Sequence, residues 1–395
     1  MGLFCARAKL VFATNANKLI LAQSYGLTFR RRVFCCTMVN SVKVFCRFRP
    51  QNSNEKSHNG VTCHEVIDEQ SVQLKRGASA STATPGGSGP FNFDRVFDTT
   101  TSQEEVYEHV GRELVEQCLD GYHCTCFAYG QTGAGKTHTM MGSQTDESQA
   151  GIIPRIVADI FSRIHGASAK EEFTVKASYV EIYLEKIRDL LSRQQATPGK
   201  GVNSKNLKIR HDKKGRGLFI EGVEEFYTTS AEEMLRLVLR GDSARATAST
   251  KMNATSSRSH SIFIITVTQK NIVSGTSKTG KLFVCDLAGS EMVKKTAATG
   301  NTLREAKQIN KSLSALGNVI KALTQGSAHV PYRDSALTRL LSEALGGNSK
   351  TSLLVVRLVN CCPAAPRTLF GFLTTLCLSL CWCVYFRRPL AAPII

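Results

Sequence analysis

The sequence lacks several features that would assign it to a common class of protein. Its fourteen cysteines include no set with zinc-finger spacing, which argues against a structural zinc site. It has no internal repeat and no heptad pattern, which argues against a solenoid and against dimerisation through a coiled coil. Lysine and arginine outnumber aspartate and glutamate by 50 to 32, giving a net charge of +18, but no aromatic–basic interleaving accompanies them. We therefore expect an acidic partner that is not a nucleic acid.

Acidic residues are missing altogether from both ends of the chain. Residues 1–37 contain six basic residues and residues 357–395 contain four. The first segment has the composition of a mitochondrial presequence or a weak signal segment, yet Met38 stands directly before a strand-like run, so we favour an extension without function. In the second, Thr368–Phe386 is nineteen residues without a charge. That length can cross a bilayer, so membrane association is one interpretation, but a divergent end is the one we favour. We predict three regions: 1–37, a folded domain at 38–356, and 357–395.

The chain does contain a glycine-rich segment that carries chemistry, at 129–141. Gly130, Gly135, Lys136 and Thr137 have the spacing of a phosphate-binding P-loop. Glycines let backbone N–H groups point at phosphate oxygens, lysine neutralises those oxygens, and threonine ligates Mg²⁺. A glycine turn before a helix is the alternative, but the strand-like run at 124–129 favours a nucleotide site. The predicted phosphate-binding residues are Gly130, Gln131, Thr132, Gly133, Ala134, Gly135, Lys136 and Thr137.

Two segments further along the chain could complete a triphosphatase. An apolar run ends in Asp286, as in a buried strand that delivers a carboxylate to the water shell of Mg²⁺. Gly289 can approach a γ-phosphate closely, and Glu291 follows it. The segment 253–260 gathers small hydroxyls around Arg258, where they can reach Mg²⁺ and the attacking water while the arginine clamps a carboxylate. Taken alone, the two segments could also be an ordinary strand end and a polar loop.

Together these segments resemble the motor domain of the kinesin family, with 253–260 and 286–291 matching its switch I and switch II. The resemblance extends from about Val42 to about Val356 and is closest to conventional, transport-type kinesin heavy chains. Further matching segments are 46–50, 93–97, 181–183, 310–320 and 330–335. It implies an α/β P-loop NTPase fold with a central, mainly parallel or mixed sheet and helices on both faces. Because the matching residues disappear after Val356, we expect the C-terminal end of the fold to be incomplete.

The resemblance also implies an activity, which is ATP hydrolysis stimulated by microtubules for movement along them in the cytoplasm. ATP and Mg²⁺ are the implied cofactors, and the microtubule cytoskeleton is the implied partner. Adenine is favoured over guanine, because no Asn-Lys pair in the chain continues as a guanine-reading Asn-Lys-x-Asp segment. Two alternatives stay open: a non-motile, nucleotide-dependent microtubule-binding protein, and an inactive motor fragment.

Residue by residue, the resemblance implies roles at the nucleotide site. Ser256 would contact the attacking water, Arg258 would pair with Glu291 as the switches close, and Gly289 would report the γ-phosphate. Mg²⁺ would be held by Thr137, Ser257 and, through water, Asp286. The implied catalytic residues are Lys136, Ser256, Arg258, Gly289 and Glu291. Beyond the P-loop, the implied nucleotide-binding residues are Arg47, Pro50, His138 and Asn253.

An amphipathic helix is predicted around residues 309–323. Apolar residues recur there at three- and four-residue steps, so one face can pack on the core while the other meets a partner. In kinesins that face contacts the microtubule, and basic residues near it would attract acidic tubulin. The predicted microtubule-binding residues are Lys213, Lys214, Lys294, Lys295, Lys307, His329, Arg333 and Arg339. Met292 and Ala336 stand where related kinesins often carry lysine, which predicts weaker binding.

Overall fold

A computed structural model describes most of the predicted domain. It covers residues 42–57, 62, 64–74, 90–192, 206–212, 217–252, 256–291, 300–346 and 349–358. At residues 74, 248–252, 256 and 300–307 only the backbone is described. The segment 1–37 and the apolar stretch Thr368–Phe386 lie outside these ranges, so their interpretations stay predictions. Among the helices that the structure describes, none is both long and apolar enough to cross a membrane.

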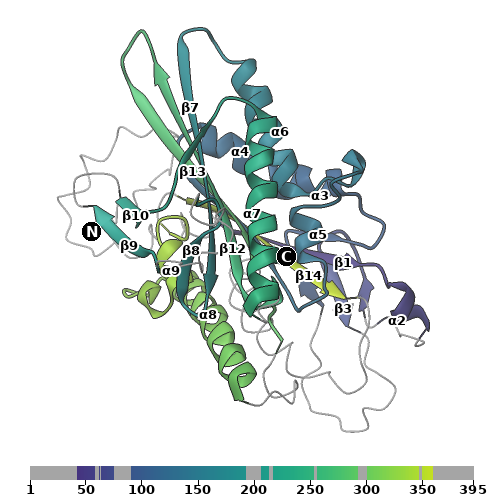
Figure 1. Cartoon of the computed structure of the whole chain (residues 1–395). Helices are drawn as coiled ribbons and strands as arrows, with labels where there is room; N and C mark the ends of the chain where they lie inside the picture. The colour runs from purple at the N-terminus through teal and green to yellow at the C-terminus, as the bar shows by residue number, and fades with distance from the viewer. Residues whose placement is uncertain are drawn as a thin grey trace, which may run out of the picture.

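The centre of the domain is one mixed sheet in the order β11–β7–β12–β13–β6–β14–β1–β5, with β8 pairing beside β7 (Figure 1). Its strands are β1 (Val42–Arg49), β5 (Arg95–Phe97), β6 (His123–Tyr129), β7 (Glu171–Tyr183), β8 (Lys186–Asp189), β11 (Phe226–Thr228), β12 (His260–Asn271), β13 (Ser277–Asp286) and β14 (Ser349–Leu358). The half from β13 to β5 is parallel, and the half from β11 to β13 is antiparallel. Two small sheets, β2 (His64–Val66) with β3 (Ser71–Leu74) and β4 (Phe91–Asn92), and β9 (Lys208–Asp212) with β10 (Gly217–Glu221), lie outside it.

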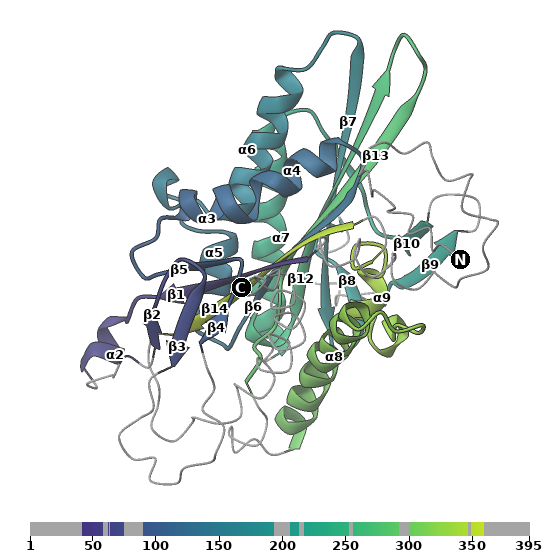
Figure 2. The same ribbon diagram turned by 180° about the vertical axis from the view of Figure 1, so that it is seen from behind.

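Helices cover both faces of the sheet, as Figures 1 and 2 show from opposite sides. One face carries α3 (Gln103–Val110), α4 (Arg112–Leu119), α6 (Ile152–His165) and α7 (Ala231–Met252). The other carries α8 (Gly300–Thr324) and α9 (Ala336–Leu340). The remaining helical segments are α2 (Ser53–Ser57), α5 (Lys136–Met140), η1 (Glu147–Gln149), η3 (Ser256–Arg258) and η5 (Tyr332–Asp334).

The central strands supply side chains to two separate apolar cores. Along β6, Cys124 and Cys126 pack into the core beneath α3, α4 and α6, while Phe127 and Tyr129 pack into the core beneath α8 and α9. This happens because successive side chains of a strand point to opposite faces. A strand that is buried on both faces reads as a continuous apolar run, which is the pattern that predicted it. The predicted α/β fold with helices on both faces is confirmed.

The amphipathic helix is also confirmed, as α8. Its predicted apolar stripe faces the sheet: Ile309, Leu313, Leu316 and Ile320 are buried, and Leu323 packs against the same core. On the opposite face Lys311, Ser314 and Lys321 are exposed. The helix therefore contacts the sheet with one face and leaves the other open to a partner.

Candidate nucleotide site and its switch segments

The P-loop connects the end of β6 to the start of α5, at the centre of the parallel half of the sheet. Gly133 and Gly135 have φ angles of 79° and 98°, which side chains other than glycine rarely adopt. Gly130 lies so close to β14 that a Cβ there would collide with the carbonyl oxygen of Val356. The three glycines are thus required by the backbone path, whatever the loop binds.

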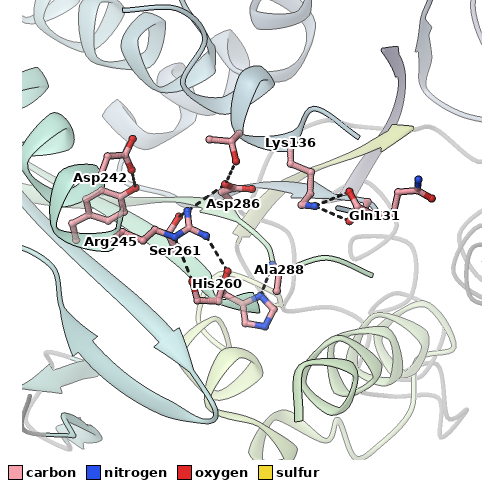
Figure 3. A network of polar contacts seen from close by, with 12 residues as sticks. Gln131, Lys136, Asp242, Arg245, His260, Ser261, Asp286 and Ala288 are labelled. Atoms are coloured by element: carbon pink, nitrogen blue, oxygen red, sulfur yellow. Dashed lines mark hydrogen bonds and ion pairs between the residues drawn. The ribbon is translucent and has the colours of Figure 1, made fainter. Parts of the chain in front are cut away.

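Lys136 is buried at the start of α5 and folds back over the loop. Its Nζ donates to the carbonyl oxygens of Gly130, at 2.8 Å, and Gln131, at 3.0 Å (Figure 3). Burial lowers the pKa of the ammonium group, and the carboxylates of Asp286 and Glu291 act in the opposite direction. A cation held beside the loop in this way is placed to meet phosphate oxygens.

Asp286 ends β13 beside the P-loop, as the sequence predicted. Its Oδ2 accepts a hydrogen bond from Thr137 Oγ1 at 2.7 Å. Its Oδ1 is buried and has no hydrogen-bond partner in the described part of the chain. Hard oxygen donors are the ligands that Mg²⁺ prefers, and an unsatisfied buried carboxylate oxygen next to a threonine hydroxyl fits such an ion with its water shell.

Arg245, from α7, is a site residue that sequence reasoning missed. It is 5% exposed, and its guanidinium donates to Ser259 O at 3.0 Å and Ser261 Oγ at 2.9 Å, and pairs with Asp286 Oδ2 at 3.4 Å (Figure 3). Arg245 therefore anchors the switch I segment and orients the carboxylate at the same time. Those partners lie 14, 16 and 41 residues further along the chain, so no local spacing marks it.

Behind Arg245 lies a second carboxylate, that of the partly buried Asp242. It accepts a hydrogen bond from Tyr179 Oη at 2.8 Å, and its burial raises its pKa. Gly241 packs so closely on the Tyr179 ring that a Cβ would collide with it. This contact fixes the distance between α7 and β7, and thereby the position of Arg245 on α7.

The segment after Asp286, matched to switch II, is bound by four different elements. Its successive backbone N–H groups donate as follows: Leu287 to Ala128 O at 3.2 Å, Ala288 to His260 Nδ1 at 3.0 Å, Gly289 to Ser257 O at 2.7 Å and Ser290 to Gly130 O at 3.2 Å. These partners belong to β6, β12, η3 and the P-loop. The segments matched to the P-loop, switch I and switch II are therefore in direct contact.

Glu291, the next residue, contacts the P-loop. Its carboxylate accepts from Thr132 N at 2.9 Å and from Thr132 Oγ1 at 2.5 Å. The resemblance implies that this carboxylate pairs with Arg258 as the switches close, and that pairing stays a prediction. Gly289 is enclosed by this contact, because a Cβ on it would collide with both Glu291 and Thr132.

Gln103 binds two of the residues that were predicted to contact the adenine base, Arg47 and His138. Arg47 is 9% exposed, and its Nη1 donates to Gln103 Oε1 at 2.6 Å and Thr139 Oγ1 at 2.9 Å. Gln103 Nε2 donates in turn to the His138 carbonyl oxygen at 2.8 Å. Burial lowers the pKa of Arg47 to about 10. Pro50, close to Arg47 in the chain, and His138, next to Thr139, are both exposed. These two residues, rather than the buried guanidinium of Arg47, are therefore accessible to a ligand.

The remaining predicted residues divide into three groups. Asn253, Lys213, Lys214, Lys294 and Lys295 lie outside the described residues, and at Ser256 and Lys307 only the backbone is described. Ser257 and Arg258 are partly buried in η3. His329, Arg333 and Arg339 are exposed on or beside η5 and α9, elements that contact α8. Arg339 also donates to Ile209 O at 3.0 Å, which ties α9 to β9.

Acid is expected to weaken the protein through His260. Burial lowers the pKa of this imidazole to about 3 from its usual value near 6.5, and the positive charges of Arg245 and Lys136 add to the shift. Between those values the folded state binds fewer protons than the unfolded chain. The stabilising contribution is therefore present above pH 6.5 and is lost as the pH falls towards 3, by up to about 1.4 kcal/mol per pH unit.

Urea denaturation from pH 7 down to pH 4 measures this effect. The free energy of unfolding of the wild-type protein, minus that of His260→Asn, should decrease as the pH is lowered from 7 to 4. A difference that stays constant with pH would contradict the prediction.

The chain is similar in sequence to known kinesins. The family model for the kinesin motor domain matches residues 47–368. A kinesin heavy chain of Gibberella moniliformis is 49% identical over 328 residues, which is 82% of this chain and 33% of the relative. The kinesin-1 heavy chain of Homo sapiens is 46% identical over 315 residues, 80% of this chain and 30% of that protein. This chain thus spans about a third of the length of these relatives.

The fold itself also has a solved counterpart. The structure of a fast kinesin, described for its ATPase mechanism and its interactions with microtubules, aligns with a TM-score of 0.74 and 43% identity. It covers 90% of this chain, and this chain covers 96% of it. The chain belongs to the kinesin family and contains a kinesin motor domain.

Proposed function

We propose that this chain is a microtubule-stimulated ATPase that drives movement along microtubules in the cytoplasm. The convergence of Lys136, Thr137 and Asp286 on one loop end is the observation that carries the proposal, since these are the groups that bind a triphosphate and its Mg²⁺. The kinesin heavy chains that match the chain support the microtubule as the track.

Phosphoryl transfer asks a protein mainly for positioning and charge stabilisation. Lys136 would leave the carbonyl oxygens of Gly130 and Gln131 and donate to the β- and γ-phosphate oxygens. Thr137 and Ser257 would ligate Mg²⁺ through their hydroxyls, and Asp286, oriented by Arg245, would hold one of its waters. When bound, Mg²⁺ neutralises charge that develops on the phosphate oxygens.

The switch segments would make hydrolysis depend on closure. Gly289 donates its N–H to Ser257 O, and we propose that it turns to the γ-phosphate when ATP is bound. Ser256 would then position the attacking water, and Glu291 would exchange Thr132 for Arg258 and accept the water's proton through a second water. Loss of the γ-phosphate would release both switches.

The base would lie against the exposed side of Pro50 and His138. Gln103 supports this edge from below by binding the His138 carbonyl and Arg47 together. Arg47 would then act by holding the edge in place and by supplying positive charge near the base, rather than by stacking freely on it.

A phosphate-release assay tests the proposed function. The purified chain should hydrolyse ATP slowly alone and roughly tenfold or more faster with microtubules, as expected when binding energy from a partner assembles the catalytic groups. GTP should be a poorer substrate. A turnover rate that microtubules do not change would refute the proposed coupling.

Reversing charge on the proposed track face should weaken microtubule binding. Lys294, Lys295 and Arg333, changed together to glutamate, should raise the dissociation constant roughly tenfold or more, since each exposed ion pair contributes about 0.2–1 kcal/mol. The salt dependence should also flatten, because fewer charges are screened. Co-sedimentation with microtubules at several salt concentrations measures both effects.

A matched pair of single variants separates position from net charge. Arg333→Glu and Lys170→Glu make the same change in net charge at exposed residues. Lys170, however, directly precedes β7, whose first residues lie at the end of the sheet away from α8 (Figure 1). Only Arg333→Glu should weaken co-sedimentation. Equal weakening by both variants would show that only the total charge matters and that the binding face lies elsewhere.

A further inference from the structure

One hydrogen bond of the switch II segment differs in kind from its neighbours. The N–H groups of Leu287, Gly289 and Ser290 donate to backbone carbonyls, whereas the N–H of Ala288 donates to a side chain, His260 Nδ1. A backbone contact survives substitution, but this one depends on the imidazole. His260 begins β12, is 3% exposed, and lies directly beneath Ala288 (Figure 3).

The second ring nitrogen of His260 reaches α8. Nε2 lies 2.8 Å from Ser312 Oγ, and the Ser312 hydroxyl donates to Ile309 O at 2.7 Å. Because a backbone N–H can only donate, Nδ1 must accept from Ala288, and the ring proton therefore sits on Nε2. The chain of donors then has a single direction, from Ala288 through His260 and Ser312 to the backbone of α8. The low pKa of the buried ring keeps it in this neutral form.

Among the side chains of α8 that the structure describes, at 308–324, the rest of the interface is mostly apolar and less directional. Ile309, Leu313 and Leu316 pack on the sheet, and such contacts tolerate small sliding movements. A second polar contact, from Asn310 Nδ2 to Glu291 O, is longer at 3.4 Å. Of these two described contacts, the His260–Ser312 pair is thus the shorter, and it is a buried polar connection between α8 and the residues beside Asp286.

We propose that His260 is a positioning residue that transmits movement of the switch II backbone at Ala288 to α8 through Ser312. This inference rests on the proposed function, since nucleotide exchange is what would move Ala288, which lies between the metal-side Asp286 and Gly289. A rigid ring held at both nitrogens transfers displacement along its axis. The α8 face that carries Lys311 and Lys321 would move with it.

Two substitutions remove the contact between His260 and Ser312, one at each of the two residues. Ser312→Ala removes the hydroxyl that His260 meets. His260→Asn keeps an acceptor oxygen near the Nδ1 position for Ala288 but is too short to reach Ser312. Ser314→Ala is the matched control, because it makes the same change on the same helix at an exposed residue. Thermal denaturation of each variant confirms that it is folded.

Hydrogen–deuterium exchange of α8 provides a readout without microtubules. In the wild-type protein and in Ser314→Ala, exchange at residues 308–324 should differ between ADP and a non-hydrolysable ATP analogue. In Ser312→Ala and His260→Asn that difference should shrink roughly fivefold or more, the lower range of typical coupling between sites. A purely structural role would instead raise exchange equally in both nucleotide states.

Fluorescent ADP and ATP analogues, titrated into each protein, separate the two possible failures. If the wild-type chain binds neither, the proposed function is refuted and this inference falls with it. If all proteins bind nucleotide and both variants keep the full exchange difference, the inference alone is refuted.

The ring itself supplies an independent check. Nitrogen NMR of ¹⁵N-labelled histidine, assigned by loss of the signal in His260→Asn, should show the Nε2–H tautomer unchanged from pH 8 to pH 5. An Nδ1–H tautomer, or protonation in that range, would overturn the direction of the donor chain and with it the proposal.

Discussion

Glu291→Ala should leave nucleotide binding nearly intact while reducing microtubule-stimulated turnover by about 10²–10³, the usual cost of losing a group that acts in the transition state. The carboxylate binds Thr132 of the P-loop in this structure, at 2.9 Å and 2.5 Å. The proposed closed state needs the same carboxylate on Arg258. Alanine can make neither contact, so the switches would not close on ATP although the phosphate-binding loop is unchanged.

Phosphate release in the presence of microtubules, together with titration of a fluorescent nucleotide, measures the two effects separately. Arg258→Ala provides the partner control. If the two residues act as a pair, each single variant and the double variant should lose turnover to a similar extent, because removal of either partner already abolishes the pair. Wild-type turnover in Glu291→Ala, or additive losses in the double variant, would contradict the assigned pairing.

Lys136→Ala should instead abolish the binding of nucleotide itself. The buried ammonium is bound to the loop itself, and its two carbonyl partners, on Gly130 and Gln131, cannot attract phosphate when it is absent. A charge-assisted contact to phosphate contributes about 1.5–3 kcal/mol, so loss of two such contacts should weaken ATP binding by roughly 10²-fold or more. Hydrolysis should then be undetectable at substrate concentrations that saturate the wild-type protein.

Equilibrium titration with a fluorescent ATP analogue measures this loss directly. Lys170→Ala serves as a control, since it removes an exposed lysine far from the P-loop. Circular dichroism should show that Lys136→Ala is folded, because the lysine side chain is not part of either apolar core. Tight nucleotide binding by Lys136→Ala would show that the loop does not bind phosphate through this residue.

The sequence by itself determined the elements whose chemistry is local. The glycines of the P-loop are dictated by backbone angles and by a close approach to β14, so they appear as a spaced motif. The strand ending in Asp286 and the stripe of α8 follow from periodic burial, on two faces for the strand and on one for the helix. These features could be predicted because each is set by residues close together in the chain.

The arrangement of the sheet was only partly predictable. Continuous apolar runs predicted the parallel half around β6, where both faces are covered by helices. The long antiparallel pairing of β12 with β7 could not be predicted, since strand order depends on which long-range contacts form and not on the pattern of one strand. The resemblance implied a mainly parallel or mixed sheet, and tertiary packing decided which strands run antiparallel.

Only the tertiary structure revealed the residues that orient the site from behind. Arg245 meets Asp286 from α7, and Gln103 joins Arg47 to His138. His260 contacts both Ala288, 28 residues further along the chain, and Ser312, 52 residues further along. In the sequence, an arginine within a helix and a glutamine at a helix start carry no signal. The histidine that ends the segment 253–260 belongs to a recognised motif, but the motif does not indicate which groups its ring contacts. The sequence thus determined which groups can touch a phosphate, because that chemistry demands adjacent residues of particular types. The fold decided which groups hold them, because buried polar side chains bind whatever partner the packing of distant elements brings within hydrogen-bonding distance.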